Sequence, residues 1–79
     1  MSAQSIVVTV SDEMLAEIHQ VADDLAARGM EVHRVMPITG VITGAYDPAQ
    51  VSSLQRVKGV LSVENEAVAR LPQFGSSVQ

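Results

Sequence analysis

The chain alternates short runs of β-branched residues with stretches whose apolar positions recur every three or four residues. The run at 5–10, SIVVTV, is apolar almost throughout, as in a strand at the centre of a sheet. Its alternation places Ile6, Val8 and Val10 on one face and Val7 and Thr9 on the other. The segments 30–36 and 38–46 predict two further strands, joined at Pro37 as a hairpin or short meander. Residues 60–66 predict the last strand.

Two segments carry helical patterns. The first begins after Ser11, a candidate N-cap that is followed by two acidic residues, and ends at Gly29. It predicts an amphipathic helix of about four to five turns, whose inner face holds Met14, Leu15, Ile18, Val21, Ala22 and Leu25. The second begins at Asp47-Pro48, with Gln50 three residues after the cap, and ends at Gly59. Its inner face holds Val51, Leu54 and Val57.

The order strand, helix, strand, strand, helix, strand predicts a ferredoxin-like α+β sandwich, with two helices on one face of a four-stranded antiparallel sheet. Residues 1–70 would form this domain and residues 71–79, rich in Gly and Ser and lacking periodicity, a loose tail. Gly44 falls in the strand expected at the centre of the sheet. We expect it to be structural, because a missing side chain there would let a helix backbone come close.

The face of the sheet opposite the helices must meet water or a partner. In the strand at 38–46 one set of alternating residues is Val41, Thr43 and Ala45, and the other is Ile42, Gly44 and Tyr46. Neither this strand nor the run at 5–10 can present a charged face to water, which is unusual for an exposed sheet. The pattern therefore predicts a contact surface, for a second copy of the chain or for another protein.

Composition narrows the class of partner. The chain has 79 residues and a formal net charge of −4, and its five basic residues are scattered along it, so no nucleic-acid partner is expected. There is no cysteine, which excludes disulfides and thiolate chemistry. No apolar stretch approaches the length of a membrane span, and the first residues lack the basic start of a signal peptide. The expectation is a small acidic protein in the cytoplasm.

No residue pattern indicates a catalytic, metal-binding or nucleotide-binding site. His19 and His33 lack ligands at metal-binding spacing, and the pairs Asp23-Asp24 and Glu64/Glu66 are expected to face water. Lys58 is the sole lysine, so a Schiff-base aldolase would have to use it, but the ordinary role of a cation at a helix end explains it. The glycines form no nucleotide-binding motif. We therefore expect no enzyme activity, no cofactor and no metal.

Residues 39–66 resemble the propeptides of subtilisin-type proteases and the related proteinase B inhibitors. The matching positions are Gly40 to Ala45, the helix start at Asp47-Pro48, Leu54, and the strand from Val60 to Glu64. The resemblance implies a ferredoxin-like fold and a stand-alone inhibitor or folding chaperone of a serine protease. It also implies that the open sheet face packs on the protease.

In that family the segment after the last strand runs along the substrate cleft of the protease. In this chain the segment would consist of Arg70, Leu71, Pro72, Gln73 and Phe74. Pro72 would stiffen it and lower the ordering entropy lost on binding. The alternative is that Leu71 and Phe74 fold back and cover the domain.

The first half is similar to a second family, the ACT regulatory domains. Their helix start, D-x-P-G-x-L-A-x-I, shares Asp12, Leu15, Ala16 and Ile18 with residues 11–18, SDEMLAEI, although the proline and glycine are absent. This resemblance implies a small regulatory or oligomerisation domain that can form a dimer and binds a small metabolite. It stands as the alternative to the protease-binding function.

Overall fold

The computed structural model describes residues 3–65. The elements follow the order that the sequence predicts: strand, helix, strand, strand, helix, strand. The strands are β1 (Gln4–Val10), β2 (Glu31–Met36), β3 (Val41–Tyr46) and β4 (Val60–Asn65). The helical segments are the 3-10 helices η1 (Asp12–Glu17) and η2 (Pro48–Gln50) and the α-helices α1 (Ile18–Ala27) and α2 (Val51–Leu54).

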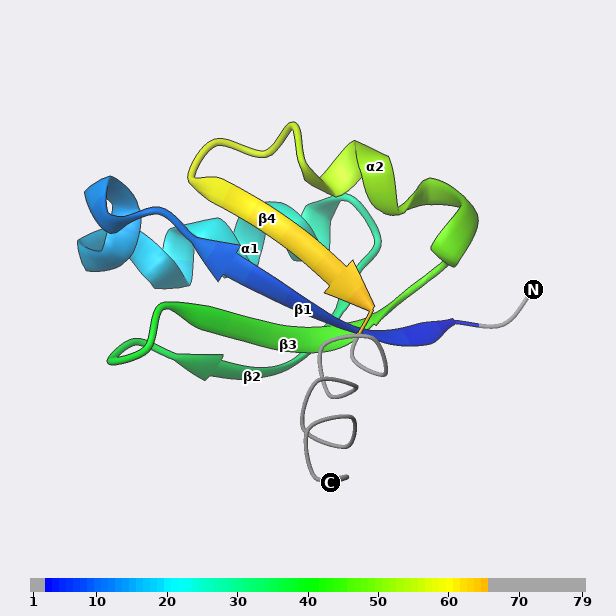
Figure 1. Cartoon of the computed structure of the whole chain (residues 1–79), viewed down its shortest axis with the longest axis horizontal. Coiled ribbons are helices and arrows are strands. Elements are labelled where there is room, and N and C mark those ends of the chain that lie inside the picture. Colours follow the sequence, from blue (N-terminus) through cyan, green and yellow to red (C-terminus); the bar gives the residue numbers. More distant parts are fainter. Residues whose placement is uncertain (1–2, 66–79) are drawn as a thin grey trace, which may run out of the picture.

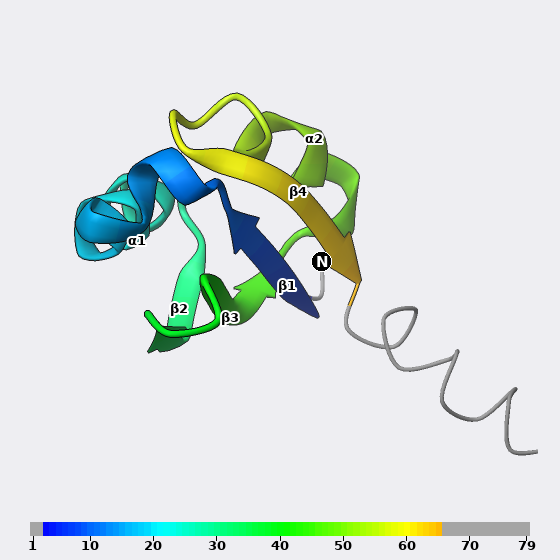
Figure 2. The same ribbon diagram turned by 60° about the vertical axis from the view of Figure 1, so that its left-hand side comes forward.

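The strands form one antiparallel sheet in the order β2-β3-β1-β4, so that β1 and β3 are central (Figure 1). β2 and β3 are joined as the hairpin that the sequence predicts. α1 lies beside β2, whereas α2 lies beside β4 (Figure 2). The domain is therefore an α+β fold with a four-stranded antiparallel sheet and two α-helices.

The core lies on one face of this sheet and is almost wholly aliphatic. Of the two sets that alternation separates in β1, the inward one is Ile6, Val8 and Val10, and each of these side chains is at most 4% exposed. No polar or charged side chain is buried in residues 3–65. The buried core consists of Ile6, Val8, Val10, Ile18, Val21, Ala22, Leu25, Met30, Ile42, Tyr46, Leu54, Val57 and Val63.

The first helical segment differs from the expectation of one continuous α-helix. Residues 12–17 form a 3-10 helix, and regular α-helix begins only at Ile18. Ser11 makes no side-chain capping bond; instead its backbone N–H donates to the Gly59 carbonyl at 2.8 Å. The start of this segment is therefore held by the loop before β4 and not by its own N-cap. The tighter winding of η1 still lets Met14 and Leu15 pack against the core.

The second helix is shorter than predicted, although its start signal is correct. The Asp47 carboxylate accepts a hydrogen bond from the Ala49 N–H at 2.9 Å, and Pro48 occupies the first position. The α-helical part nevertheless spans only four residues. After it, the Val57 N–H donates to the Leu54 carbonyl at 3.1 Å, a turn that lets both side chains reach the core.

The third strand begins later than the predicted 38–46, because residues 37–40 form the turn of the hairpin. Gly40 has a φ of +74°, a left-handed conformation that a side chain would disfavour. Its N–H donates to the Met36 carbonyl at 2.9 Å, and its carbonyl accepts from the Val10 N–H at 2.8 Å. The turn is thus bonded to the end of β1 as well as to β2.

Both edge strands contain an irregularity in their pairing. On β2, Val32 is opposite Gly44 and Arg34 is opposite Thr43, so His33 is an extra residue. On β4, Val60 is opposite Val10 and Ser62 is opposite Thr9, so Leu61 is an extra residue. In a regular strand, two side chains three residues apart point to opposite faces of the sheet. With the extra residue, Val32 and Val35 both pack against the core, as do Val60 and Val63.

Gly44 is structural, but for a different reason from the one that the sequence predicts. A Cβ atom placed on Gly44 would overlap the backbone carbonyl of Glu31 and lie 2.8 Å from the Met30 Cε. The close neighbour is therefore the first residue of β2 and not a helix backbone. The neighbouring carbonyl belongs to the sheet itself and cannot give way as a flexible side chain could.

We expect Gly44→Ala to destabilise the domain by about 3 kcal/mol or more, at or above the upper end of ordinary overpacking, because backbone must move. Thr43→Ala is the matched control, since Thr43 is half-buried on the other face, and it should cost less than about 1 kcal/mol. Urea unfolding followed by circular dichroism measures both values. Equal costs for the two variants would contradict the close contact at Gly44.

Candidate protein-binding face

The face of the sheet that the helices leave open has an uncharged centre. Its central strands contribute Val7 and Thr9 from β1 and Val41, Thr43 and Ala45 from β3, all half-buried. The sequence predicts this grouping of residues into two faces, and the structure shows which of the two faces is the open one. Side chains of this kind present methyl groups and hydroxyls, so the centre can be covered by a partner without removing a charge from water.

The charges on this face lie at its two edges. Strand pairing places Arg34, Thr43, Val7 and Glu64 in one row across the sheet, with Arg34 on β2 and Glu64 on β4. Both charged side chains belong to exposed residues, and neither makes an ion pair within residues 3–65. The next row is uncharged and holds Met36, Val41, Thr9 and Ser62.

Two large apolar side chains are exposed at one end of the sheet. Ile38, in the turn after β2, is 96% exposed, and Leu61, the extra residue of β4, is 68% exposed. They lie at opposite edges of the sheet, next to the uncharged row that contains Met36 and Ser62. The open face therefore has an uncharged centre, with Arg34 and Glu31 on its β2 edge and Glu64 on its β4 edge, and two exposed apolar residues lie at one end of the sheet.

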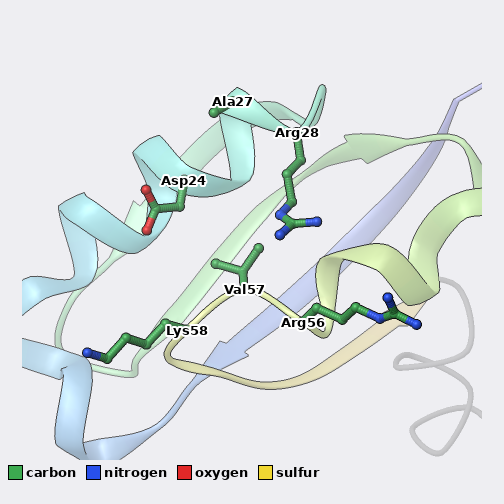
Figure 3. Close-up of a pocket in the computed structure, with 6 residues that line it drawn as sticks. All are labelled: Asp24, Ala27, Arg28, Arg56, Val57 and Lys58. Carbon is green, nitrogen blue, oxygen red and sulfur yellow. The ribbon is translucent and has the colours of Figure 1, made fainter.

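A pocket of about 340 Å³ lies between the end of α1 and the loop after α2. Three basic residues that are scattered in the sequence, Arg28, Arg56 and Lys58, are among those that line it. Figure 3 shows that Arg28 and Val57 point toward one another across this space. Arg56 and Lys58 extend away from it in opposite directions.

The electrostatics of the pocket follow from its position at helix ends. α1 and α2 both terminate there, and the last carbonyls of a helix carry partial negative charge. The Arg28 guanidinium donates from Nη1 to the Ser53 carbonyl at 3.3 Å, so this cation is used to bind the end of α2. Asp24, four residues earlier, accepts instead from Gln20 Nε2 at 3.1 Å. The pocket thus lies between two helix ends, and the Arg28 guanidinium in it already donates a hydrogen bond to the Ser53 carbonyl.

Tyr46 completes this arrangement from the sheet. Its side chain is 8% exposed and its hydroxyl donates to the Arg28 carbonyl at 2.9 Å, with the Ser53 hydroxyl 3.4 Å away. The Ser53 hydroxyl in turn donates to the Gln50 carbonyl at 2.9 Å. One tyrosine at the end of β3 therefore hydrogen-bonds the C-terminus of α1 and contacts α2 at Ser53.

The titratable residues that the sequence analysis singled out do not come together in one site. His19 and His33 are both exposed, as expected, and the Nε2 of His33 lies 3.5 Å from a Glu31 carboxylate oxygen. Asp23 is exposed, whereas Asp24 lines the pocket and is half-buried. Lys58 is exposed beside the same pocket. Within residues 3–65 no group of three or more histidine, aspartate or glutamate side chains is arranged to hold a metal ion.

The predicted cleft segment lies outside the described residues. This applies to Arg70, Leu71, Pro72, Gln73 and Phe74, to Glu66, and to the proposed tail at 71–79. Of the two parts of the predicted binding surface, the structure therefore describes the open sheet face.

Comparison of the chain with protein-family models, with curated proteins and with solved structures found no match. No helix within residues 3–65 is both long enough and apolar enough to cross a membrane. The function is accordingly inferred from the residues and geometry of the domain.

Sequence alternation located the centre of the open face but missed its charged edges. Regular alternation through residues 31–36 would separate Arg34 from Glu31, whereas the extra residue His33 brings both onto the open face. The available signal was the spacing of valines three apart in both VHRV (32–35) and VLSV (60–63). Two inward valines at that spacing require an inserted residue between them.

We expect Tyr46→Phe to reduce the free energy of unfolding by about 1 kcal/mol, the scale of one lost hydrogen bond, because the Arg28 carbonyl loses its donor. Ser53→Ala leaves the bond from Tyr46 to Arg28 intact and should cost less. Thermal and urea unfolding of the two variants measures the difference. A larger loss for Ser53→Ala would contradict the assignment of the tether to Tyr46.

Proposed function

We propose that the chain is a protein-binding domain of the ferredoxin-like class that acts through its open sheet face, as subtilisin-type propeptides and proteinase B inhibitors do. The observation that carries the proposal is the uncharged centre of that face, formed by Val7, Thr9, Val41, Thr43 and Ala45. The strand order β2-β3-β1-β4 and the separation of the helices by two strands support the fold assignment.

The partner on this proposal is a subtilisin-type serine protease. Residues 39–66 carry the resemblance, and within them the capped helix start at Asp47 and the inward residues Leu54 and Val63 support the family's pattern of apolar positions. The segment Arg70 to Phe74 would follow β4 into the substrate cleft of the protease. The domain supplies binding energy, and the segment supplies the residues that occupy the cleft.

The alternative is an ACT-like regulatory domain that binds a small metabolite. The segment with the resemblance, residues 11–18, uses its first amide internally, since the Ser11 N–H donates to the Gly59 carbonyl. Fewer backbone donors are therefore open to a ligand at that turn. Shifts in melting temperature with a panel of amino acids would distinguish this alternative, since a ligand that binds only the folded state raises it.

Inhibition of a subtilisin-type protease tests the proposed function directly. Thr43→Lys places a charge at the centre of the open face and should raise the inhibition constant by about tenfold or more, since that charge must be desolvated. Ser52→Lys, on an exposed position of α2, is the matched control and should leave inhibition unchanged. An intact chain that inhibits no subtilisin-type protease removes the proposal.

Truncation separates the two roles of the terminal segment. A chain that ends at Arg70 should lose inhibition with little change in melting temperature if residues 71–74 bind the cleft. If those residues cover the domain instead, the same truncation should lower stability by roughly 1–3 kcal/mol, the scale of exposing one or two apolar side chains. Inhibition assays and thermal unfolding on the same two proteins make the comparison.

Lys58 provides the test of an enzymatic role. We expect Lys58→Ala to alter no reaction, because the side chain is exposed at the mouth of the pocket beside two helix ends. The measurement is turnover of 2-oxo-acid aldol substrates by the intact chain and by the variant. Robust turnover that disappears in Lys58→Ala would establish an aldolase and contradict the proposal.

A further inference from the structure

We propose that the open face binds a second copy of this chain, in a symmetric dimer whose two-fold axis runs along the strands between β1 and β3. The inference rests on the proposed use of this face for binding and adds a partner to it. The argument begins with the row Arg34, Thr43, Val7 and Glu64, which crosses the sheet from edge to edge.

The row is complementary to its own reversed copy. When two sheets pack face to face about an axis parallel to their strands, each row meets the same row of the other copy in reverse order. Arg34 then faces Glu64 of the second copy, and Thr43 faces Val7. Because the operation is symmetric, the second Arg34–Glu64 pair forms at the opposite edge. Neither charge has an ion-pair partner within residues 3–65 of its own chain.

The same two-fold axis also brings together the ends of the two sheets that carry exposed apolar residues. The axis keeps each end of the sheet at the same height, so the β2 edge of one copy meets the β4 edge of the other. Ile38, which is 96% exposed after β2, is brought to the side of Leu61, which is 68% exposed on β4. The uncharged row between them places Val41 against Thr9 of the second copy. Of these two rows, the charged one therefore pairs Arg34 with Glu64, and the next one pairs uncharged residues only.

The size of the face sets the expected affinity. Strands about 4.8 Å apart and about 3.3 Å per residue give a face of roughly 400 Å² per copy in projection for four strands of six or seven residues. Such an area falls at the low end of specific interfaces, so we expect a reversible dimer with a dissociation constant of roughly 10–500 μM.

Charge reversal tests the dimer, with the full chain studied by analytical ultracentrifugation across this concentration range. Arg34→Glu and Glu64→Arg should each weaken self-association by about tenfold or more, because each converts two attractive pairs into repulsive ones. An equimolar mixture of the two single variants should form a heterodimer, since both pairs are then opposite in charge. The double variant Arg34→Glu/Glu64→Arg should also self-associate like the unmodified chain.

The mixture experiment distinguishes this geometry from other modes of association. A dimer insensitive to all three charge variants overturns the proposal, as does a chain that stays monomeric at millimolar concentration, whether its face is free or covered by residues 66–79. Charge reversal at Asp23, an exposed residue of α1, is the control and should leave self-association unchanged. These measurements contain no protease, so they succeed or fail independently of inhibition.

Discussion

The close approach of β2 to Gly44 is the contact on which the arrangement of the sheet depends. The Glu31 carbonyl and the Met30 side chain occupy the space that any other residue at position 44 would fill. Met30 is 3% exposed and lies between the end of α1 and the start of β2. A larger residue at position 44 would push away both the edge strand and the segment that connects it to the helix. The core and the open face are defined together by this one missing side chain.

The parts of the fold that follow from local alternation could be predicted from the sequence. The order of strands and helices, the grouping of Ile6, Val8 and Val10 on one face, and the cap at Asp47 all depend on residues near one another in the chain. What the sequence could not supply was contact between distant segments. The Ser11 amide is satisfied by Gly59, forty-eight residues away in the numbering, and this changes how the first helix begins. The same holds for Tyr46, whose hydroxyl bonds to the carbonyl of Arg28.

The candidate face shows the same division between local and distant information. Its centre could be read from alternation in β1 and β3, because both strands are regular. Its charged edges could not, because an extra residue in each edge strand changes which side chains share a face. The pocket is a further case, since Arg28 and Lys58 line one space only when the end of α1 and the loop after α2 are brought together. There the distances assign Arg28 a structural role, through its bond to the Ser53 carbonyl.

The extra residues His33 and Leu61 also bear on how the protein behaves at high concentration. An edge strand with regular spacing offers a ladder of free amides and carbonyls on which another chain can add a strand, and repeated addition yields fibrils. An inserted residue interrupts that ladder on β2 and again on β4. Growth of the sheet at its edges is thereby disfavoured on both sides. The proposed association through the face, by contrast, occupies that face in both copies and would stop at a dimer, without polymerisation.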